Sequence, residues 1–545
     1  MPTVAPDDVR TPIDDYLARQ QDLTAVERFA DHHDRATGPL HERWYRQLLP
    51  AAPPGPGQQY RFEVDMDSCT SCKSCVSACH ALNGLDEGES WRSVGVVVGV
   101  GPQGPTQQAV TTACHHCVDP ACLAGCPVDA YEKDPITGIV SHLDDQCIGC
   151  SYCTWTCPYD VPRFNERLGI VRKCDMCSDR LADGEAPACV QACPTGAIAI
   201  GVVDVADLVA ATGPDAALVP GAPASATTVP TTRYHRAEAL PADATATDDW
   251  SEAPKHAHVP LVVMLVLTQL SVGTFVAVAA LARFAGALPD QTLRVGAVAA
   301  MGSGLVAIGA SVGHLGRPLQ AWRAVIGVGH SWLSREIVAF AVFAGTAVGA
   351  AASRLLAPRS GLADLLGAVV SGIGVAAVGC SVLIYAVTGR RFWRLDRTAA
   401  SFAGTTVTCG LATSVVVVVA TVDAAHLAGT VRVLAALLAA TTLTSLAWHA
   451  WLPQRGTEDP VLDRSARLLR GPLAATQRAH LALVAAGGVA GPLLLVALLA
   501  EPSPPVAALR TVAVLSLLLV VRGELAGRTL FFRAMASPRM PGMPR

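Results

Sequence analysis

Sixteen of the 18 cysteines lie between Cys69 and Cys193, in four motifs of four. The third motif and its following proline have the spacing Cys-x2-Cys-x2-Cys-x3-Cys-Pro. In this pattern three close cysteines bind one [4Fe-4S] cluster and the fourth binds its neighbour. The chemistry that these residues predict is one-electron transfer. The motifs are Cys69, Cys72, Cys75 and Cys79; Cys114, Cys117, Cys122 and Cys126; Cys147, Cys150, Cys153 and Cys157; and Cys174, Cys177, Cys189 and Cys193.

Two other uses of cysteine fit this pattern less well. Structural disulfides are disfavoured because dense thiol triplets pair badly and residues 1–40 contain no apolar run that could serve as a secretion signal. Zinc sites usually combine two separated cysteine pairs, and the first and third motifs each hold four cysteines within eleven residues. We therefore expect four [4Fe-4S] clusters in series, which form a wire without a substrate pocket of its own.

Crossing of the ferredoxin type would pair the first motif with the fourth and the second with the third. The last cysteine of each motif then completes the cluster of its partner motif. Four cluster sites are expected: Cys69, Cys72, Cys75 and Cys193; Cys174, Cys177, Cys189 and Cys79; Cys114, Cys117, Cys122 and Cys157; and Cys147, Cys150, Cys153 and Cys126.

Composition separates the chain into two unlike halves. Its 545 residues are 51% hydrophobic and only 16% charged, against about 25% charged in a soluble protein. Residues 1–255 carry a net charge of −17, and residues 256–545 carry +13. An acidic soluble part joined to a basic membrane part is therefore expected, and a wholly soluble enzyme is disfavoured.

The pattern along the chain predicts an α+β ferredoxin-like domain joined to an all-α membrane bundle. Residues 1–58 are expected to form a helical extension, with an amphipathic stretch from Leu23 to Tyr45, and residues 59–200 the cluster domain. Residues 201–256 are rich in Ala, Pro, Thr and Asp and are expected to form a partly extended linker along a partner surface. Within 257–545 eight apolar segments have about the length of a membrane-spanning helix: 258–282, 295–313, 336–353, 362–387, 402–422, 431–452, 480–500 and 505–527.

Both halves resemble subunits of one family. Residues 59–200 resemble the four-cluster iron–sulfur subunit of the dimethyl sulfoxide reductase family of molybdoenzymes, through "CIGCSYCTWTCPYDVPRFN" (147–165) and "KCDMCSDRLADGEAPACVQACPTGAI" (173–198). The chain departs from the pattern at His80, where a proline would follow Cys79. The membrane half resembles the anchor subunit of the same family, through "HVPLVVMLVLTQLSVG" (258–273), "HLGRP" (314–318), "SWLSREI" (331–337), "YAVTGRRFW" (385–393) and "GELAGRTLFFR" (523–533).

The resemblance implies two subunits fused into one electron-transfer and membrane-anchor chain. It implies a haem-free anchor that oxidises or reduces a quinone, with menaquinone as the expected quinone, and a separate molybdopterin-containing catalytic subunit. It also implies that the Cys147 group lies nearest the quinone and the Cys69 group nearest the catalytic subunit. No nucleic-acid partner is expected, and the terminal substrate and the direction of electron flow stay open.

Ionisable residues near helix ends are candidates for the quinone site, because such residues are expensive in a membrane. A quinone exchanges two protons with its two electrons, and histidine suits both hydrogen bonding and proton transfer. His314 is the leading candidate because it stands beside Arg317 in the anchor-like motif. Gln269 could bind quinone or a neighbouring helix. Glu336 could be a proton relay or could form a structural ion pair. The expected quinone residues are His314, Arg317, His258, Gln269, Arg335 and Glu336.

The arginine distribution predicts the membrane orientation. With eight spans, loops on the cluster side hold 16 arginines and opposite loops hold 6. The positive-inside rule then places the cluster domain on the cytoplasmic side of the cell's inner membrane. A basic face that docks the acidic domain would give the same asymmetry.

Two alternative functions remain at this stage. The same wire could serve a hydrogenase or a multihaem cytochrome. An ion-pumping module is disfavoured, because the opposite half of the membrane region has almost no ionisable residues to form a continuous polar path.

Overall fold

The computed structural model describes residues 11–22, 48–101, 104–248, 253–285, 288–422, 424–454, 459–501 and 505–543, with scattered residues between 24 and 35. A short exposed helix, α1 (Pro12–Gln21), begins at a capping box in which Thr11 and Asp14 bond each other's backbone N–H groups. Most of the expected amphipathic stretch from Leu23 to Tyr45 lies outside the described residues.

The cluster domain is built from small sheets and short helices that carry the cysteines. One sheet has the order β8-β1-β9, a second has the order β10-β2-β3, and β4-β5 and β6-β7 are hairpins. The strands are β1 (Gln58–Asp65), β2 (Ser93–Gly101), β3 (Gly104–Thr112), β4 (Tyr131–Lys133), β5 (Val140–His142), β6 (Arg163–Asn165), β7 (Ile170–Arg172), β8 (Ile198–Asp204), β9 (Arg233–His235) and β10 (Thr245–Ala246). The helices are α4 (Ser74–Leu82), α5 (Ala121–Gly125), α6 (Tyr152–Thr156), α7 (Ser178–Ala182), α8 (Ala188–Gln191) and α9 (Val205–Ala211).

The segment 201–256 differs from the expected linker. It begins inside β8, which pairs antiparallel with β1 over Gln58–Val64. Further along, β9 pairs parallel with β1 and β10 pairs antiparallel with β2. The segment is only partly extended, since it contains the helix α9, and its strands lie on the sheets of its own domain. The composition of the segment disfavours a long helix, but it does not indicate which strand edge the segment pairs with.

Among the residues that the structure describes, eight helices are long and apolar enough to cross a membrane, which agrees with the eight segments expected from the sequence. The spans are α10 (Val259–Phe284), α11 (Asp290–Val312), α12 (Trp332–Leu356), α13 (Gly361–Ala386), α14 (Leu395–Thr421), α15 (Ala424–Gln454), α17 (Ala474–Ala485) continued through a π-turn (Ala486–Ala490) into α18 (Gly491–Leu498), and α19 (Val506–Arg533). On the cluster side, three connections are short helices: η4 (Pro318–Gly329), η5 (Arg391–Trp393) and α16 (Pro460–Arg470).

Helices α10 and α14 form the buried centre of the bundle. Their backbones approach closely where Gly273 faces Gly410: a Cβ built on Gly273 would lie 1.9 Å from the carbonyl oxygen of Thr406. Small residues at such crossings are typical of membrane helices, which associate through close packing.

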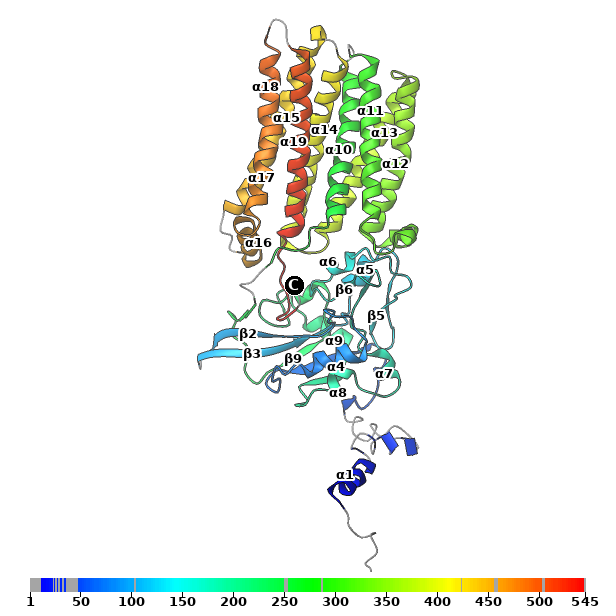
Figure 1. Cartoon of the computed structure of the whole chain (residues 1–545), viewed down its shortest axis with the longest axis vertical. Helices are drawn as coiled ribbons and strands as arrows, with labels where there is room; N and C mark the ends of the chain where they lie inside the picture. Colours follow the sequence, from blue (N-terminus) through cyan, green and yellow to red (C-terminus); the bar gives the residue numbers. More distant parts are fainter. Residues whose placement is uncertain are drawn as a thin grey trace, which may run out of the picture.

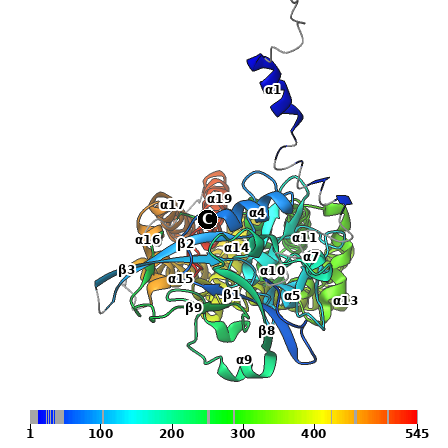
Figure 2. The ribbon, with the colours of Figure 1, turned by 90° about the horizontal axis from the view of Figure 1, so that it is seen from below.

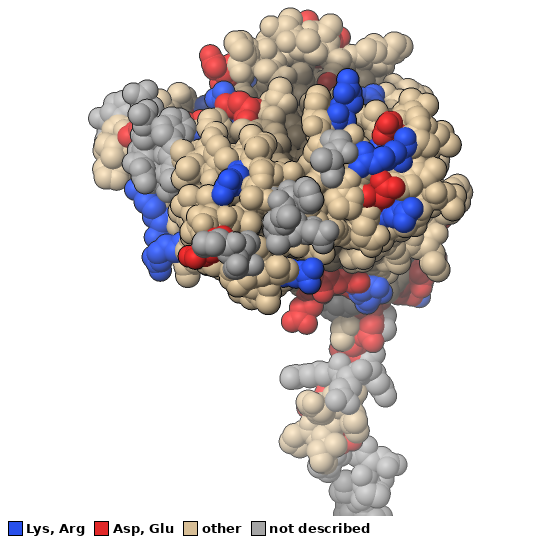
Figure 3. All heavy atoms as spheres, turned by 90° about the horizontal axis from the view of Figure 1, so that it is seen from above, with Lys and Arg blue, Asp and Glu red and all other residues tan. Residues whose placement is uncertain are grey.

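The cluster domain lies against one end of the bundle, as Figure 1 shows, and its β2–β3 hairpin projects to one side (Figure 2). The opposite end of the bundle is drawn in Figure 3, where acidic and basic side chains lie in small scattered groups on a largely uncharged surface. The tail after α19 returns to the cluster domain, where Met540 and Met543 are buried in its core.

The two halves meet through backbone, at a seam formed by Gly149, Gly169 and Gly316. The N–H of Gly316 donates to the carbonyl of Gly149 (3.3 Å) and that of Arg317 to the carbonyl of Ile148 (3.0 Å). A Cβ on Gly316 would lie 2.1 Å from the carbonyl oxygen of Gly169, so no side chain fits there. The anchor-like motif therefore rests directly on the backbone of the third cysteine motif.

We expect Gly316→Ala to weaken this seam. A methyl group forced against a rigid carbonyl costs about 1–3 kcal/mol, so the midpoint of thermal unfolding in detergent should fall while the iron content stays unchanged. Gly329→Ala is the matched control, because a Cβ there meets nothing within 4 Å. Equal midpoints for the two variants would show that the seam is not tightly packed.

Candidate functional site

The 16 motif cysteines form no disulfides and come together in four groups. The grouping is visible in which thiols influence one another. Burial raises the pKa of Cys69, and the nearby Cys75, Cys193 and Cys72 raise it further. Burial likewise raises the pKa of Cys79 to about 12, with Cys189 and Cys177 as neighbours.

The other two groups lie nearer the bundle and follow the same crossed pattern. The pKa of Cys117 is raised well above its ordinary value by burial and by the nearby Cys114, Cys157 and Cys122. That of Cys153 is raised by burial and by Cys150, Cys126 and Cys147. In each half the last cysteine of a motif joins the group of the partner motif, as ferredoxin-type crossing requires.

Contacts between groups arrange them in a line. Cys75 lies close enough to Cys189 to raise its pKa, which links the first group to the fourth-motif group. Cys114 likewise lies close enough to Cys174 to raise its pKa, which links the fourth-motif group to the second-motif group. Tyr131 lies near thiols of both the second and third motifs, among them Cys122 and Cys153. The line therefore runs from the Cys69 group to the Cys147 group, which lies at the membrane bundle.

The surroundings of the thiols fit iron–sulfur clusters. Backbone N–H groups donate to sulfur at Cys126 (3.3 Å), Cys147 (3.4 Å), Cys174 (3.4 Å) and Cys193 (3.2 Å), and such bonds to cluster sulfurs help set the cluster potential. Among the described residues, no three His, Cys, Asp or Glu side chains could hold one metal ion. Thiols around a cubane stand further apart than zinc ligands, because each binds a different iron.

Two buried cations stand between the groups. Arg92 is 2% exposed and lies near thiols of the first and fourth motifs, among them Cys189. Lys173 is 3% exposed; burial acts to lower its pKa, but the nearby Cys114 and Cys122 raise it above its ordinary value. A buried positive charge stabilises the more negative, reduced form of a neighbouring cluster. Neither residue could be predicted from the sequence, since nothing in their local pattern distinguishes them from surface charges.

A cavity of about 220 Å³ opens where the Cys147 group meets the bundle. It is lined from the cluster side by Ile148, Cys150, Tyr152 and Trp155, and from the membrane side by α10–α13. Of the six expected quinone residues, two line it: His314 and Glu336. An engineered cavity of about 150 Å³ admits benzene, so this one accommodates a quinone ring.

His314 connects the cavity to the third motif. Its Nε2 lies 3.2 Å from the carbonyl oxygen of Cys150. A carbonyl only accepts, so Nε2 carries the proton and Nδ1 is left as an acceptor. Glu336 is buried on α12 and accepts a short hydrogen bond from the hydroxyl of Ser381. The cavity thus offers two proton-accepting groups beside a cluster thiol.

His258 lies next to His314 and leads away from the cavity. Its ring contacts those of His314 (5.2 Å between centroids), His256 (4.7 Å) and Trp155 (5.0 Å). Burial, together with the two neighbouring histidines, lowers the pKa of His258 to about 3. His256 and His258 also line a second, more open cavity that contains Asp160 and Lys255. The three histidines therefore connect the first cavity to a polar one.

The remaining three expected residues lie elsewhere. Arg317 donates to the backbone carbonyls of Asp144 (2.7 Å) and Cys147 (3.5 Å), and so fastens the two halves together. Arg335 donates to the carbonyls of Val328 and Gly329 and covers the ring of Trp332. Neither side chain lines the cavity.

Gln269 is fully buried in the centre of the bundle. Its Oε1 accepts from Arg528 (2.9 Å), which also donates to Thr405 (3.2 Å); Thr405 in turn donates to Glu524 (2.7 Å). The contact joins α10, α14 and α19, so this side chain binds neighbouring helices. That was the second of the two roles considered for it.

Arg390 is a further residue that sequence analysis did not single out. It donates to the carbonyl of Trp155 (3.0 Å) and pairs with Asp160 (2.7 Å), whose pKa it keeps low despite burial. The Arg-Arg pair in the anchor-like motif was visible in the sequence, but its partner across the junction was not.

Comparison with known proteins covers both halves. Residues 106–203 match the model of a 4Fe-4S dicluster domain, and residues 255–533 match that of the DMSO reductase anchor subunit (DmsC). The protein is 38% identical over 154 residues to the B subunit of the anaerobic dimethyl sulfoxide reductase of Escherichia coli (strain K12), and the match covers 27% of this protein and 75% of the relative.

Two other relatives match shorter stretches. The protein is 45% identical over 114 residues to the hydrogenase-2 operon protein HybA of Escherichia coli O157:H7 (20% of this protein, 34% of the relative). It is 49% identical over 88 residues to the formate dehydrogenase-O iron-sulfur subunit of Escherichia coli (strain K12) (16% and 29%). These matches agree with the resemblance expected from the motifs.

Paired cysteine variants test the crossed grouping. We expect Cys126→Ser to alter the same electron paramagnetic resonance signal as Cys147→Ser, because both thiols belong to one group. Cys157→Ser should instead alter the signal that Cys114→Ser alters. If Cys126→Ser shared its effect with Cys114→Ser, each motif would hold its own cluster and the crossing would be wrong.

Proposed function

The chain belongs to the DMSO reductase anchor subunit family, fused behind an iron–sulfur electron-transfer domain, and from this premise we propose that it carries electrons between a membrane quinone and a separate molybdopterin-containing catalytic subunit. The route consists of four [4Fe-4S] clusters, held by the four crossed cysteine groups. Each cluster, when bound, exchanges one electron. The Cys147 group lies nearest the quinone and the Cys69 group nearest the catalytic subunit.

One observation carries the quinone proposal: a single cavity is lined by Cys150 of the third motif and by His314 and Glu336 of the membrane half. A quinol there would give up two protons and two electrons. His314 Nδ1 accepts one proton, since its Nε2–H is held by the Cys150 carbonyl. The buried carboxylate of Glu336 accepts the other. The electrons leave one at a time through the adjacent Cys147 group.

A proton leaving His314 has a path away from the membrane. His258 and His256 follow it in ring contact and end in the polar cavity beside Asp160. All three histidines lie on the cluster side, so protons and electrons depart toward the same side. Arg317, Arg335 and Gln269 act in docking and packing, and of the six expected residues we assign His314, Glu336 and His258 to quinone chemistry.

The arginine-rich loops support a cytoplasmic position for the cluster domain in an inner membrane, because loops with more arginine stay on that side. The catalytic subunit would then bind in the cytoplasm. Menaquinone is the proposed quinone, and the resemblance to the family is its support.

Replacing His314 tests the quinone site. We expect His314→Ala to slow quinol oxidation by about 100-fold, the range for loss of a proton-transfer group, while the iron content and cluster spectra stay unchanged. His330→Gln is the matched control: His330 bonds the carbonyl of Cys126 (3.0 Å) just as His314 bonds that of Cys150, but it does not line the cavity.

An equal loss of activity in the two variants would show that both substitutions act by weakening the contact between the cluster domain and the bundle. A loss of iron in the His314 variant alone would place it in folding. Either result would remove the support for a quinone at this cavity.

Metal analysis of the native complex tests the partner. Purification from the native membrane in mild detergent should give roughly sixteen irons per chain, with molybdenum or tungsten in a larger co-purifying subunit. If nickel or haem were found without molybdenum, electron transfer through the four clusters would stand, but the partner would be a hydrogenase or a cytochrome.

A further inference from the structure

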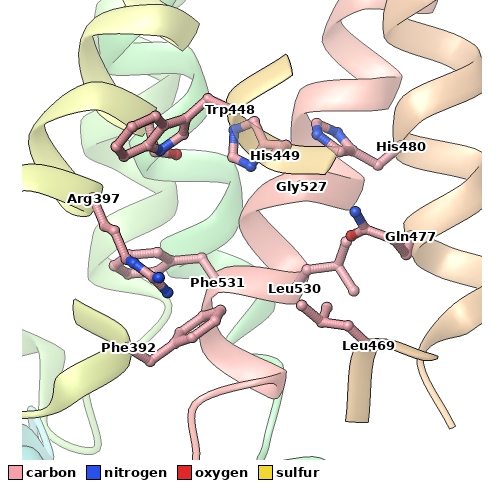
Figure 4. A pocket seen from close by; sticks show the side chains of 11 residues that line it. Phe392, Arg397, Trp448, His449, Leu469, Gln477, His480, Gly527, Leu530 and Phe531 are labelled. Atoms are coloured by element: carbon pink, nitrogen blue, oxygen red, sulfur yellow. The ribbon is translucent and has the colours of Figure 1, made fainter. Parts of the chain in front are cut away.

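A separate cavity of about 80 Å³ lies between α14, α15, α16, α17 and α19, on the cluster side of the bundle (Figure 4). It shares no lining residue with the quinone cavity. In Figure 4 the guanidinium of Arg397 reaches in from one side, and Gln477 and His480 lie on the other. The lining comprises Phe392, Arg397, Ser401, Trp448, His449, Leu469, Gln477, His480, Gly527, Leu530 and Phe531.

Two polar atoms in this cavity are buried without a partner among the described residues: Nη1 of Arg397 and Nε2 of His480. The His480 side chain is 1% exposed, so bulk solvent does not reach it. An unpaired buried donor or acceptor is destabilising, because it has lost its hydrogen bonds to water and gained none in the protein. A cavity that holds two such atoms on opposite walls is therefore suited to a ligand that supplies partners for both.

The chemistry of the two atoms defines the ligand. Arg397 is a permanent cation, and none of the described lining residues is acidic, so the cavity favours an anion. Nδ1 of His480 donates to the carbonyl of Gly523 (2.8 Å), which leaves Nε2 as an acceptor. A hydroxyl would satisfy it. The ligand thus combines an anionic oxygen with a hydroxyl group.

The size of the cavity argues against a second quinone. A space of about 150 Å³ is needed to admit benzene, and this cavity is about half as large. It fits a compact group such as a phosphodiester.

A groove continues from the cavity at Trp448, which lines both. The groove has a volume of about 710 Å³ and runs between α14 and α15. Its other lining residues are small or apolar: Ala400, Ala403, Gly404, Val407, Ala440, Thr441, Thr444, Ser445 and Ala447. A hydrocarbon chain attached to the headgroup would lie there, along membrane-spanning helices.

We propose that this cavity and groove bind an anionic phospholipid with a hydroxyl-bearing headgroup, such as phosphatidylglycerol. Arg397 pairs with the phosphodiester, His480 accepts from the headgroup hydroxyl, and an acyl chain fills the groove. The adjacent α16 supports the choice of an anionic lipid, because it is amphipathic and exposes Arg467 and Arg470 at the same end of the bundle.

Lipid analysis of the purified full-length protein tests the proposal. We expect about one tightly held phosphatidylglycerol per chain, and at least a tenfold lower content in Arg397→Gln, since charge-assisted bonds to a phosphodiester exceed about 1.4 kcal/mol. Arg394→Gln is the charge-matched control: that residue lies one turn away, pairs with Asp396 (3.3 Å) and does not line the cavity. It should keep its lipid.

A second variant guards against misfolding of the first. Ala403 is exposed on the groove surface, so Ala403→Phe should block the acyl chain without disturbing the core, and it too should lose the lipid. Quinone is measured in the same samples. Equal phosphatidylglycerol in all variants, or selective loss of quinone, would overturn the proposal.

Discussion

The structure depends on a direct backbone contact between a soluble domain and a membrane bundle. Gly149, Gly169 and Gly316 bring two loops so close that no side chain fits between them. This contact places the Cys150 carbonyl on His314 and closes the cavity between them. An electron donor dissolved in the bilayer and a wire in the aqueous phase can exchange electrons only where such contact exists. The other interactions at the junction hold this geometry in place.

Most of those interactions are hydrogen bonds from bundle side chains to backbone carbonyls of the cluster domain. Ser331 donates to Gly125 (2.7 Å), Arg323 to Asp145 (2.7 Å) and Arg390 to Trp155 (3.0 Å). Each such bond contributes only about 1 kcal/mol net. Carbonyl acceptors are available at this junction because several belong to the cysteine motifs themselves: the carbonyls of Cys126, Cys147 and Cys150 accept from His330, Arg317 and His314. The fold that holds the cysteines therefore also provides the docking surface.

The features that could be predicted from the sequence are those that depend on the spacing of residues near one another in the chain. Cysteine intervals predict the cluster motifs, and runs of apolar residues predict the eight helices, because both depend on near neighbours in the chain. The crossed grouping followed from family-type spacing, and the thiols lie accordingly. Features that depend on distant partners were not accessible: Arg92 and Lys173 look like surface charges until the folded domain buries them. Arg317 and Gln269 were predicted as quinone residues, but spacing alone could not separate quinone binding from docking or helix packing.

Fusion changes the energetics of the junction. Two separate subunits would lose translational and rotational freedom on docking, at a cost of several kcal/mol, and a surface made of weak carbonyl bonds would have to offset it. Here the chain crosses the junction twice. It enters the bundle just after Lys255, whose N–H donates to the carbonyl of Arg533 (3.1 Å), and it returns after α19 to bury Met540 in the cluster domain. Two tethers give the halves a high effective concentration. The seam therefore does not need to supply much binding energy. Glycines can occupy it, although larger side chains would bind more strongly, because larger side chains would hold the clusters too far from the cavity.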